Sequence, residues 1–476
     1  MTDFTHNTFI SPFSWRYGSE EMRYLWSEDY KRRLMRRVWV ALAAAQHIAG
    51  LVSAEQLADL ERHADDINIE RALEIERETR HDVMAEIRAF AEQCPVGGGI
   101  IHWGATSADI TDNVDVLRQR EAAQRLVDRL RRLLAAFARR IEETAGLPIM
   151  AHTHIQPAEP TTLGYRLAIY AQDVLEDYRD LSALVGNLRG KGFKGAVGSQ
   201  ASFVELLSDT DMTAGQMEML AMARLDLPYF PLATQTYSRQ QDLRILQALA
   251  GIASSLHKFA LDFRILQSPP FGEWAEPFGK QQVGSSAMPF KRNPIIAENI
   301  CSLARLVAAQ SGVAWDNASQ AILERSLDDS ANRRVFLPES FLAVDEILQR
   351  AELLVDGMVI DHEQIDRNLT HYGPFAATER VLMAIVRTGA DRQEAHEWLR
   401  EASLQAWSTL RTGQENPLVA LLIADKRLTS YLPAEKIRRL MTADGHVGTA
   451  EKRARDFATT LHAIIKPISD APSAAT

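Results

Sequence analysis

Long stretches without proline restrict the fold of this chain more than any other feature. Such stretches between neighbouring prolines include residues 96–147, 161–227, 295–337 and 339–373. They are rich in Ala, Leu, Arg and Glu, which favour helix, and they lack the residue that most strongly disrupts a helix interior. We therefore expect long helices, with prolines marking the breaks between them.

The stretch after Asp115 also has the apolar period of a bundle helix. Its apolar residues recur at alternating steps of three and four, at Val127, Leu130, Leu134, Phe137 and Ile141. This spacing lines them up along one narrow helix face, and arginines occupy the other faces. The sequence predicts one helix over about 115–145 and a second over about 163–190.

The rest of the pattern gives the fold class. Strand-like alternation is scarce, and the chain has no internal repeat or low-complexity linker. We predict an all-α fold of three helical domains. The central domain, over about residues 107–360, is a bundle of long helices, with smaller helical domains over residues 1–106 and 361–476.

The composition excludes several classes of protein. The 476 residues include 63 acidic and 53 basic ones, and the net charge of −10 argues against nucleic-acid or membrane-surface binding. Cys94 and Cys301 are too few for a disulfide framework or a cysteine-built zinc site. No secretory signal is visible, and the longest apolar run, residues 38–45, is far short of the ~20 residues that span a bilayer. We expect a cytoplasmic protein.

Polar residues gather at the breaks between the expected helices. Six segments are rich in Thr, Ser, His, Asn, Gln and Arg: residues 78–83, 101–113, 152–166, 234–239, 284–294 and 324–334. A purely structural bundle has little use for so many polar groups at the ends of its helices. The pattern therefore indicates an enzyme.

Two histidines in the third segment leave several readings open. His152 and His154 have a spacing found at zinc and iron sites, but it places both on one face only in an extended segment. No acidic cluster of metal-site spacing accompanies them. The alternatives are packing or capping by one ring while the other is solvated, or proton transfer by a neutral imidazole.

Adjacent aspartates in the last segment also suggest a metal, in the manner of magnesium–diphosphate enzymes. Asp328 and Asp329 lack the second aspartate-rich motif that such a site needs. We favour an acidic pair neutralised by the arginines Arg325, Arg333 and Arg334. Those arginines and Ser330 suit the binding of a phosphate or carboxylate.

The segment "GSSAMPFKRNP", residues 284–294, fits neither helical nor strand periodicity. Its glycine spacing is wrong for a phosphate-binding loop of the GxxxxGK type. Gly284 permits unusual dihedral angles, while Pro289 and Pro294 prevent continuous helix. We expect a semi-rigid flap that presents Ser285, Ser286, Lys291 and Asn293.

This segment resembles the signature of the fumarase/aspartase superfamily. Together with "RHDV", "HWGATS", "THIQPAEPTTLG", "QTYSR" and "ERSLDDSANRR", it resembles the adenylosuccinate lyase family within that superfamily. The resemblance runs from about Ser14 to about Glu397, and the last sixty or so residues match poorly. Asn299 is a departure, since it stands where animal-type members have an arginine near the substrate.

The resemblance implies a β-elimination that releases fumarate from a succinylated amine on a purine nucleotide or its precursor. By the same match His154 is the general acid for the leaving nitrogen and Ser285 is the general base, which Lys291 or backbone N–H groups would have to stabilise. The aci-carboxylate intermediate needs fixed hydrogen-bond donors. Lys291, Asn293, Thr106 and Ser107 are the candidates for that role.

The remaining site residues follow from the same match. His81 would bind the substrate phosphate or orient the acid, and Gln235 would reach the substrate's amide or ring. The other substrate ligands are Arg16, Tyr17, Arg80, Asp82, Thr153, Arg325, Ser330 and Arg334. No cofactor or metal is implied.

The resemblance also implies a homotetramer with active sites shared among chains. The alternatives are another lyase of the superfamily, such as argininosuccinate lyase, a carboxymuconate cycloisomerase, or a non-catalytic helical scaffold.

Overall fold

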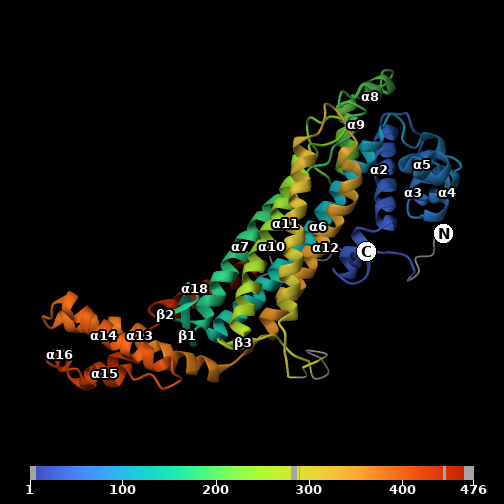
Figure 1. Cartoon of the computed structure of the whole chain (residues 1–476). Helices are drawn as coiled ribbons and strands as arrows, with labels where there is room; N and C mark the ends of the chain where they lie inside the picture. The colour runs from blue at the N-terminus through green and yellow to red at the C-terminus, as the bar shows by residue number, and fades with distance from the viewer. Residues whose placement is uncertain (1–6, 280–286, 289, 443–445, 466–476) are drawn as a thin grey trace. The chain divides into compact units, whose positions relative to one another are not determined.

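The computed structural model describes residues 7–279, 287–288, 290–442 and 446–465 (Figure 1). Helices make up most of these residues, and the strands are few and short, so the predicted all-α fold is confirmed. The chain packs into two compact units, each assembled from three separate stretches of sequence. Unit 1 comprises residues 1–130, 176–254 and 302–349, and unit 2 comprises residues 131–175, 255–301 and 350–476.

Five long helices each contribute one part to each unit. They are α6 (Ser107–Thr144), α7 (Leu163–Asn187), α10 (Gln240–Gln267), α11 (Ile295–Ser319) and α12 (Asp328–Gly357). The two helices predicted from periodicity and proline spacing are confirmed as α6 and α7, although α6 begins earlier than expected. The predicted apolar face of α6 is fully buried at Leu130, Leu134, Phe137 and Ile141.

Proline does not divide the helices in the way that the sequence suggested. Pro338 lies inside α12, and Pro374 lies inside α13 (His362–Arg387). An interior proline costs about 3 kcal/mol, whereas each large apolar side chain that is fully buried contributes about 1.5–3 kcal/mol. The residues of α12 that follow Pro338 include Phe341, Ile347 and Leu348, all fully buried, so packing outweighs the proline.

Unit 1 adds short helices from the first hundred residues and from the segment after α7. These are η1 (Pro12–Ser14), α1 (Glu20–Leu25), α2 (Glu28–Ile48), α3 (Ala54–Arg62), α4 (Ile69–Thr79), α5 (Asp82–Gln93), η2 (Gly98–Ile100), α8 (Ala201–Leu206) and α9 (Ala214–Arg224). The side chains of Ser27 and Ser53 cap the N-termini of α2 and α3 by accepting backbone N–H groups. Inside the unit, Arg36 and Arg32 share the buried carboxylate of Glu86 at 2.9 and 2.6 Å.

Unit 2 contains the strands and the C-terminal helices. Strand β1 (Pro148–Thr153) pairs antiparallel with β2 (Gln156–Thr162), and β3 (Trp274–Ala275) pairs with β4 (Val359–Ile360). The C-terminal part consists of α13, α14 (Arg392–Leu410), α15 (Leu418–Ala424), α16 (Lys426–Thr429), α17 (Ala434–Leu440) and α18 (Ala450–Ile465). Helices α13 to α17 have an apolar cluster of their own, which includes Val381, Leu399 and Leu422.

Within the described residues, no helix is both long enough and apolar enough to cross a membrane. The three-domain division drawn from the sequence stays a prediction.

Candidate active site

A cavity of about 760 Å³ in unit 1 gathers most of the predicted substrate ligands. Nine of them line it: Arg80, His81, Asp82, Thr106, Ser107, Gln235, Arg325, Ser330 and Arg334. They come from four of the polar segments, residues 78–83, 101–113, 234–239 and 324–334. The fold therefore brings together side chains that lie up to about 250 residues apart in the sequence.

The corner between α4 and α5 presents His81 in a fixed orientation. Arg80 ends α4 in the left-handed conformation, with φ of 54°, and its N–H donates to the carbonyl of Glu76 at 2.7 Å. His81 then caps α5, because its Nδ1 accepts the N–H of Met84 at 3.3 Å. A neutral ring that accepts at Nδ1 carries its proton on Nε2. His81 can therefore offer a hydrogen-bond donor to a ligand.

Asp82, the first residue of α5, is paired with an arginine from α12. Its Oδ2 accepts a hydrogen bond from NH2 of Arg334 at 2.9 Å. Partial burial alone would raise the pKa of Asp82, but the charges of Arg334 and Lys31 hold that pKa below its usual value. The ionised carboxylate thus holds Arg334 at the cavity.

The start of α6 forms another part of the wall. The backbone N–H of Thr106 donates to Oδ2 of Asp109 at 2.9 Å, while the hydroxyls of Thr106 and Ser107 have no hydrogen-bond partner among the described residues. The first N–H groups of a helix also lack intrahelical partners and carry partial positive charge. This wall is therefore suited to binding an anion such as a carboxylate.

A buried network of charges underlies the cavity. Arg239 donates to both oxygens of Asp112 at 3.2 Å and from Nε to Asp329 at 2.6 Å. Arg333 donates from Nε to Asp242 at 2.8 Å. Burial would raise the pKa of Asp242, but the charges of Arg333 and Arg239 lower it. Burial would likewise raise the pKa of Asp329, but the charges of Arg239 and Arg325 lower it. The charged forms of Asp242 and Asp329 are therefore stabilised, and their hydrogen bonds hold the two guanidinium groups in fixed positions.

The sequence does not predict this network. Arg239 lies inside a quoted segment without an assigned role, and Arg333 is expected to neutralise the acidic pair and to suit a phosphate or carboxylate, not to pair with Asp242. Asp112 and Asp242 are buried within helices, where a carboxylate without a cation would cost several kcal/mol. In the sequence both look like surface residues of a helix, so neither their burial nor their arginine partners could be predicted from it.

The acidic pair of the last segment has different partners from those expected. Asp329 is bonded to Arg239 and, at 2.8 Å, to Arg325, whereas Arg333 and Arg334 pair with other carboxylates. The expected neutralisation by Arg325 is confirmed, and that by Arg333 and Arg334 through ion pairs was wrong. Among the described residues, no group of three or more His, Cys, Asp or Glu side chains is arranged to hold a metal ion.

The segment with the two histidines is a β-hairpin in unit 2. His154 and Ile155 form its two-residue turn, both in the left-handed conformation with φ of 53° and 60°. This turn type favours Gly and Asn, and a β-branched residue is an outlier there. Backbone strain of this kind is concentrated at functional sites. The turn leaves Thr153 and His154 exposed to solvent.

The two histidines differ in environment. His152 lies in β1, packs edge-on against Phe271 with ring centroids 5.0 Å apart, and has a pKa lowered mainly by burial. His154 is exposed at the tip of the hairpin. The packing interpretation therefore fits His152, and the role of His154 in proton transfer stays a prediction.

Besides Thr153 and His154, four predicted residues lie in described regions outside the cavity of unit 1. In the segment that follows η1, the guanidinium carbon of Arg16 lies 5.7 Å from the centre of the Trp15 ring. The ring centroids of Tyr17 and Phe13 are also 5.7 Å apart. Lys291 and Asn293 precede α11 in unit 2, and Lys291 is exposed.

Two other residues named from the sequence are Ser285 and Asn299. Ser285, the predicted base, falls outside the described residues. Asn299 lies in α11, and its Oδ1 is buried with no hydrogen-bond partner among the described residues.

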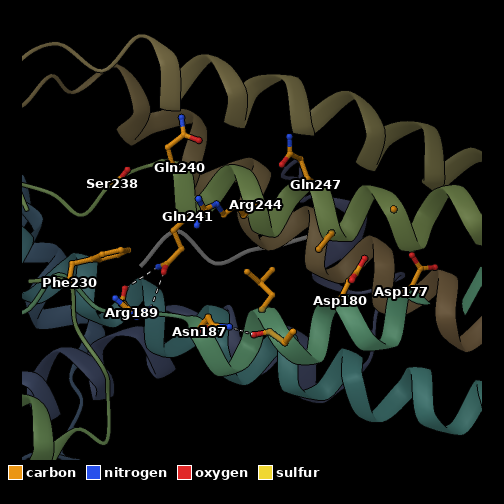
Figure 2. Close-up of a pocket in the computed structure, with 14 residues that line it drawn as sticks. Asp177, Asp180, Asn187, Arg189, Phe230, Ser238, Gln240, Gln241, Arg244 and Gln247 are labelled. Carbon is orange, nitrogen blue, oxygen red and sulfur yellow. Dashed lines mark hydrogen bonds between the residues drawn. The ribbon is translucent and has the colours of Figure 1, made fainter. Parts of the chain in front are cut away.

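A larger cavity of about 920 Å³ lies between α7 and α10, within unit 1 (Figure 2). Figure 2 shows Gln241 bonded to the backbone of Arg189, with its oxygen accepting the N–H and its amide donating to the carbonyl, both at 3.0 Å. None of the predicted site residues lines this cavity, and neither His nor Lys is among its lining residues. Size alone would therefore not select the cavity that gathers the predicted residues.

Two family models match the chain. The model described as "Lyase" matches residues 16–309, and the model described as "Adenylosuccinate lyase C-terminus" matches residues 374–457. The second match shows that the expected poor match of the last sixty or so residues was wrong. That part of the chain carries an apolar core and no polar signature, so its likeness is not visible in short motifs.

Relatives named adenylosuccinate lyase align along almost the whole chain. The protein from Saccharomyces cerevisiae is 36% identical over 95% of this chain and 94% of its own length. The protein from Schistosoma mansoni is 38% identical over 88% of each, and that from Archaeoglobus fulgidus is 34% identical over 96% of this chain and 100% of its own length.

The solved structures show the fold. The 3-carboxy-cis,cis-muconate lactonizing enzyme from Pseudomonas putida has a TM-score of 0.82 and 24% identity, covering 94% of this chain and 99% of its own. The fumarate lyase from Mesorhizobium sp. BNC1 has a TM-score of 0.80 and 24% identity, covering 95% and 99%.

Proposed function

The chain belongs to the adenylosuccinate lyase family, and on that premise we propose that it releases fumarate from two succinylated nucleotides. One is adenylosuccinate, which gives AMP, and the other is succinylaminoimidazole carboxamide ribotide, which gives AICAR. Both reactions belong to purine nucleotide synthesis, and we expect them in the cytoplasm.

The chemistry makes three demands on the protein. A base removes the proton beside a carboxylate, the electron pair is held as an aci-carboxylate, and the C–N bond then breaks. The pair of electrons from that bond leaves with nitrogen, which takes a proton from the acid. Fixed donors must stabilise the intermediate, and the substrate's phosphate and carboxylates must be held in place.

The cavity of unit 1 is the observation that carries this proposal. Its arginines Arg325 and Arg334 are held by neighbouring carboxylates, and His81 offers an Nε2–H donor. The exposed side chain of Arg80 has no ion pair among the described residues. These groups suit the phosphate and the succinyl carboxylates of the substrate. A substrate without phosphate, such as argininosuccinate, would leave part of this charge unmatched.

The acid and the base come from other segments. We assign protonation of the leaving nitrogen to His154, whose exposed position at the hairpin tip suits contact with a ligand. Thr153 beside it is a further ligand. Ser285 remains the proposed base from the sequence resemblance, with Lys291 and Asn293 on the same segment as donors to the aci-carboxylate.

A homotetramer with shared sites is part of the same proposal. It is supported by α6, which contains 38 residues and, at 1.5 Å per residue, is about 57 Å long if straight. Thr106 immediately precedes this helix, and the hairpin with His154 follows it. A nucleotide is much shorter, so we infer that different chains supply these two groups to one substrate.

A direct assay tests the activity. Purified protein is mixed with adenylosuccinate, and the ultraviolet spectrum and free fumarate are followed with time. We expect both to change, also with the ribotide, and no fumarate from argininosuccinate. A protein that releases fumarate from none of these substrates would be a non-catalytic scaffold, and one that acts only on argininosuccinate would be a different lyase.

Subunit mixing tests the shared site. His154→Ala and Ser285→Ala proteins, each inactive alone, are unfolded, combined and refolded. If the two residues serve one site from different chains, random mixing restores up to roughly a quarter of native activity. Inactive mixtures that contain hybrid tetramers would place both residues of a site on one chain.

A further inference from the structure

A single carboxylate behind the cavity wall fixes the start of α6. Asp109 is fully buried and does not line the cavity. Its oxygens accept the N–H of Thr106 at 2.9 Å and the N–H groups of Lys194 and Gly195 at 3.0 and 3.1 Å. They also accept Nζ of Lys191 at 2.6 Å. One side chain therefore joins the first turn of α6 to the segment 190–195.

The cation of this pair is equally enclosed. Lys191 is fully buried, and its Nζ also donates to the carbonyl of Gly195 at 3.0 Å. Asn113, one turn further along α6, accepts the N–H of Gly192 at 3.1 Å and donates to its carbonyl at 3.1 Å. Charges are costly to bury and are retained only with such complete hydrogen bonding. The segment is therefore held on the helix at several points.

The consequence for the cavity lies at Thr106. A threonine that begins a helix usually caps it with its own hydroxyl. Here Asp109 binds the backbone N–H of Thr106, which is half of a capping box, and the threonine hydroxyl has no partner among the described residues. The hydroxyl of Ser107 is equally unengaged. Two donors thus line the cavity with their backbone already fixed.

We propose that Asp109 and Lys191 are positioning residues that preorganise the Thr106 and Ser107 hydroxyls for the charge that develops during the elimination. This inference rests on the proposed function, which makes those hydroxyls donors to the aci-carboxylate. Negative charge on that group is greater in the transition state than in the bound substrate. Misplacing the donors should therefore lower kcat more than it raises KM.

The same segment offers a matched control. Lys194 pairs with Glu218, which also accepts the N–H of Phe193 at 2.8 Å and the amide of Gln200 at 3.0 Å. This pair is also buried, but neither side chain lines the cavity or bonds to its wall. Its removal should affect the stability of the segment without displacing Thr106.

The test compares two neutralised pairs. The Asp109→Asn/Lys191→Met and Glu218→Gln/Lys194→Met proteins leave no lone buried charge. Both are assayed with adenylosuccinate at a temperature at which circular dichroism shows them folded. We expect kcat of the first to fall at least tenfold with KM within about threefold, and both constants of the second to stay within about twofold. Equal losses in the two proteins would make the role structural and overturn the proposal.

A double-mutant cycle separates positioning from general damage. Thr106→Val and Ser107→Ala together remove both hydroxyls. If the buried pair acts through these hydroxyls, neutralising it in the Thr106→Val/Ser107→Ala background should lower kcat by less than threefold. An undiminished tenfold loss would overturn the proposal. If the Asp109→Asn/Lys191→Met protein does not fold, the Lys191→Gln single variant replaces it in the cycle. The same threefold limit on the loss of kcat then applies.

Failure of this inference is distinct from failure of the proposed function. A wild-type protein that releases no fumarate from either nucleotide refutes the function. An active wild-type protein whose Asp109→Asn/Lys191→Met variant keeps wild-type kcat and KM refutes only the positioning role.

Discussion

The cavity of unit 1 and the hairpin of unit 2 hold their polar groups in opposite ways. In the cavity, Arg239 and Arg333 are buried and bonded to carboxylates on at least two sides. In the hairpin, Thr153 and His154 are exposed, and the turn and the strand pairing beside it set their backbone conformation. The anion site and the general acid that we propose for these two regions place different requirements on the chain.

The two regions also differ in the free energies that hold their polar groups in place. Removing one partner from a buried ion pair typically costs 3–5 kcal/mol, so the cavity network resists change. The hairpin turn stores strain of order 1–3 kcal/mol at His154 and Ile155, which the β1–β2 pairing must hold in place. Rigidity in the first region comes from charge, and in the second from strand pairing.

The largest effect should separate the two histidines of the hairpin. We expect His154→Gln to lower kcat by about 10²–10⁴-fold, the range of general acid catalysis, with little change in melting temperature because the ring is exposed. His152→Gln should keep kcat within about threefold and lower the melting temperature, because it removes the contact with Phe271. Steady-state kinetics and thermal unfolding of both variants measure this, and equal loss of kcat would break the comparison.

A half-buried histidine of unit 1, His102, should make stability depend on pH. Burial lowers the pKa of His102 to about 4, while its Nδ1 accepts Nε1–H of Trp39 at 3.1 Å. Above pH 6.5 the ring is neutral in both states. As pH falls below 6.5, only the unfolded chain gains the proton, so stability should fall by about 2 kcal/mol between pH 7 and pH 5.

Replacing that histidine removes this dependence. His102 has φ of 69°, which Asn tolerates, so His102→Asn is the appropriate change. Urea unfolding at pH 7, 6 and 5 should show a shallower loss of stability for the variant than for the wild type. If variant and wild type lose the same stability between pH 7 and pH 5, His102 is protonated in the folded protein as readily as in the unfolded chain.

A smaller effect should distinguish the two adjacent aspartates. Asp329→Asn frees Arg325 and weakens the hold on Arg239, so we expect KM for adenylosuccinate to rise about tenfold, the loss of roughly one charged hydrogen bond. Asp328→Asn is the matched control, because the carboxylate of Asp328 has no ion pair among the described residues, and KM should stay within twofold. Initial rates over a range of adenylosuccinate concentrations give KM for both variants, and an equal rise in KM would contradict this expectation.

The long helices could be predicted because their signals are local. The spacing from Val127 to Ile141 requires only that one face of α6 be buried. The earlier start of α6 could not be predicted in the same way, because its first turns contain Asp109 and Asp112. Both look like surface residues in the sequence and are buried only because Lys191 and Arg239 reach them.

The site could be predicted in part. Four separate segments rich in polar residues supplied the nine cavity residues, since helix ends are where such groups collect. Two features of these regions could not be predicted from the sequence. The hairpin at Pro148–Thr162 depends on pairing between strands that contain prolines, and the charge network depends on contacts across more than a hundred residues. Neither follows from local periodicity.

The interleaving of the two units has a consequence for how the protein is made. Unit 1 needs residues as late as 349, and unit 2 draws on residues 131–175 as well as on those after 350. Domains that are continuous in sequence can fold one after another as they leave the ribosome. Here neither unit is complete until about three-quarters of the chain has been synthesised. Truncated products therefore expose unpaired bundle helices, and neither unit can be expressed alone as one uninterrupted fragment.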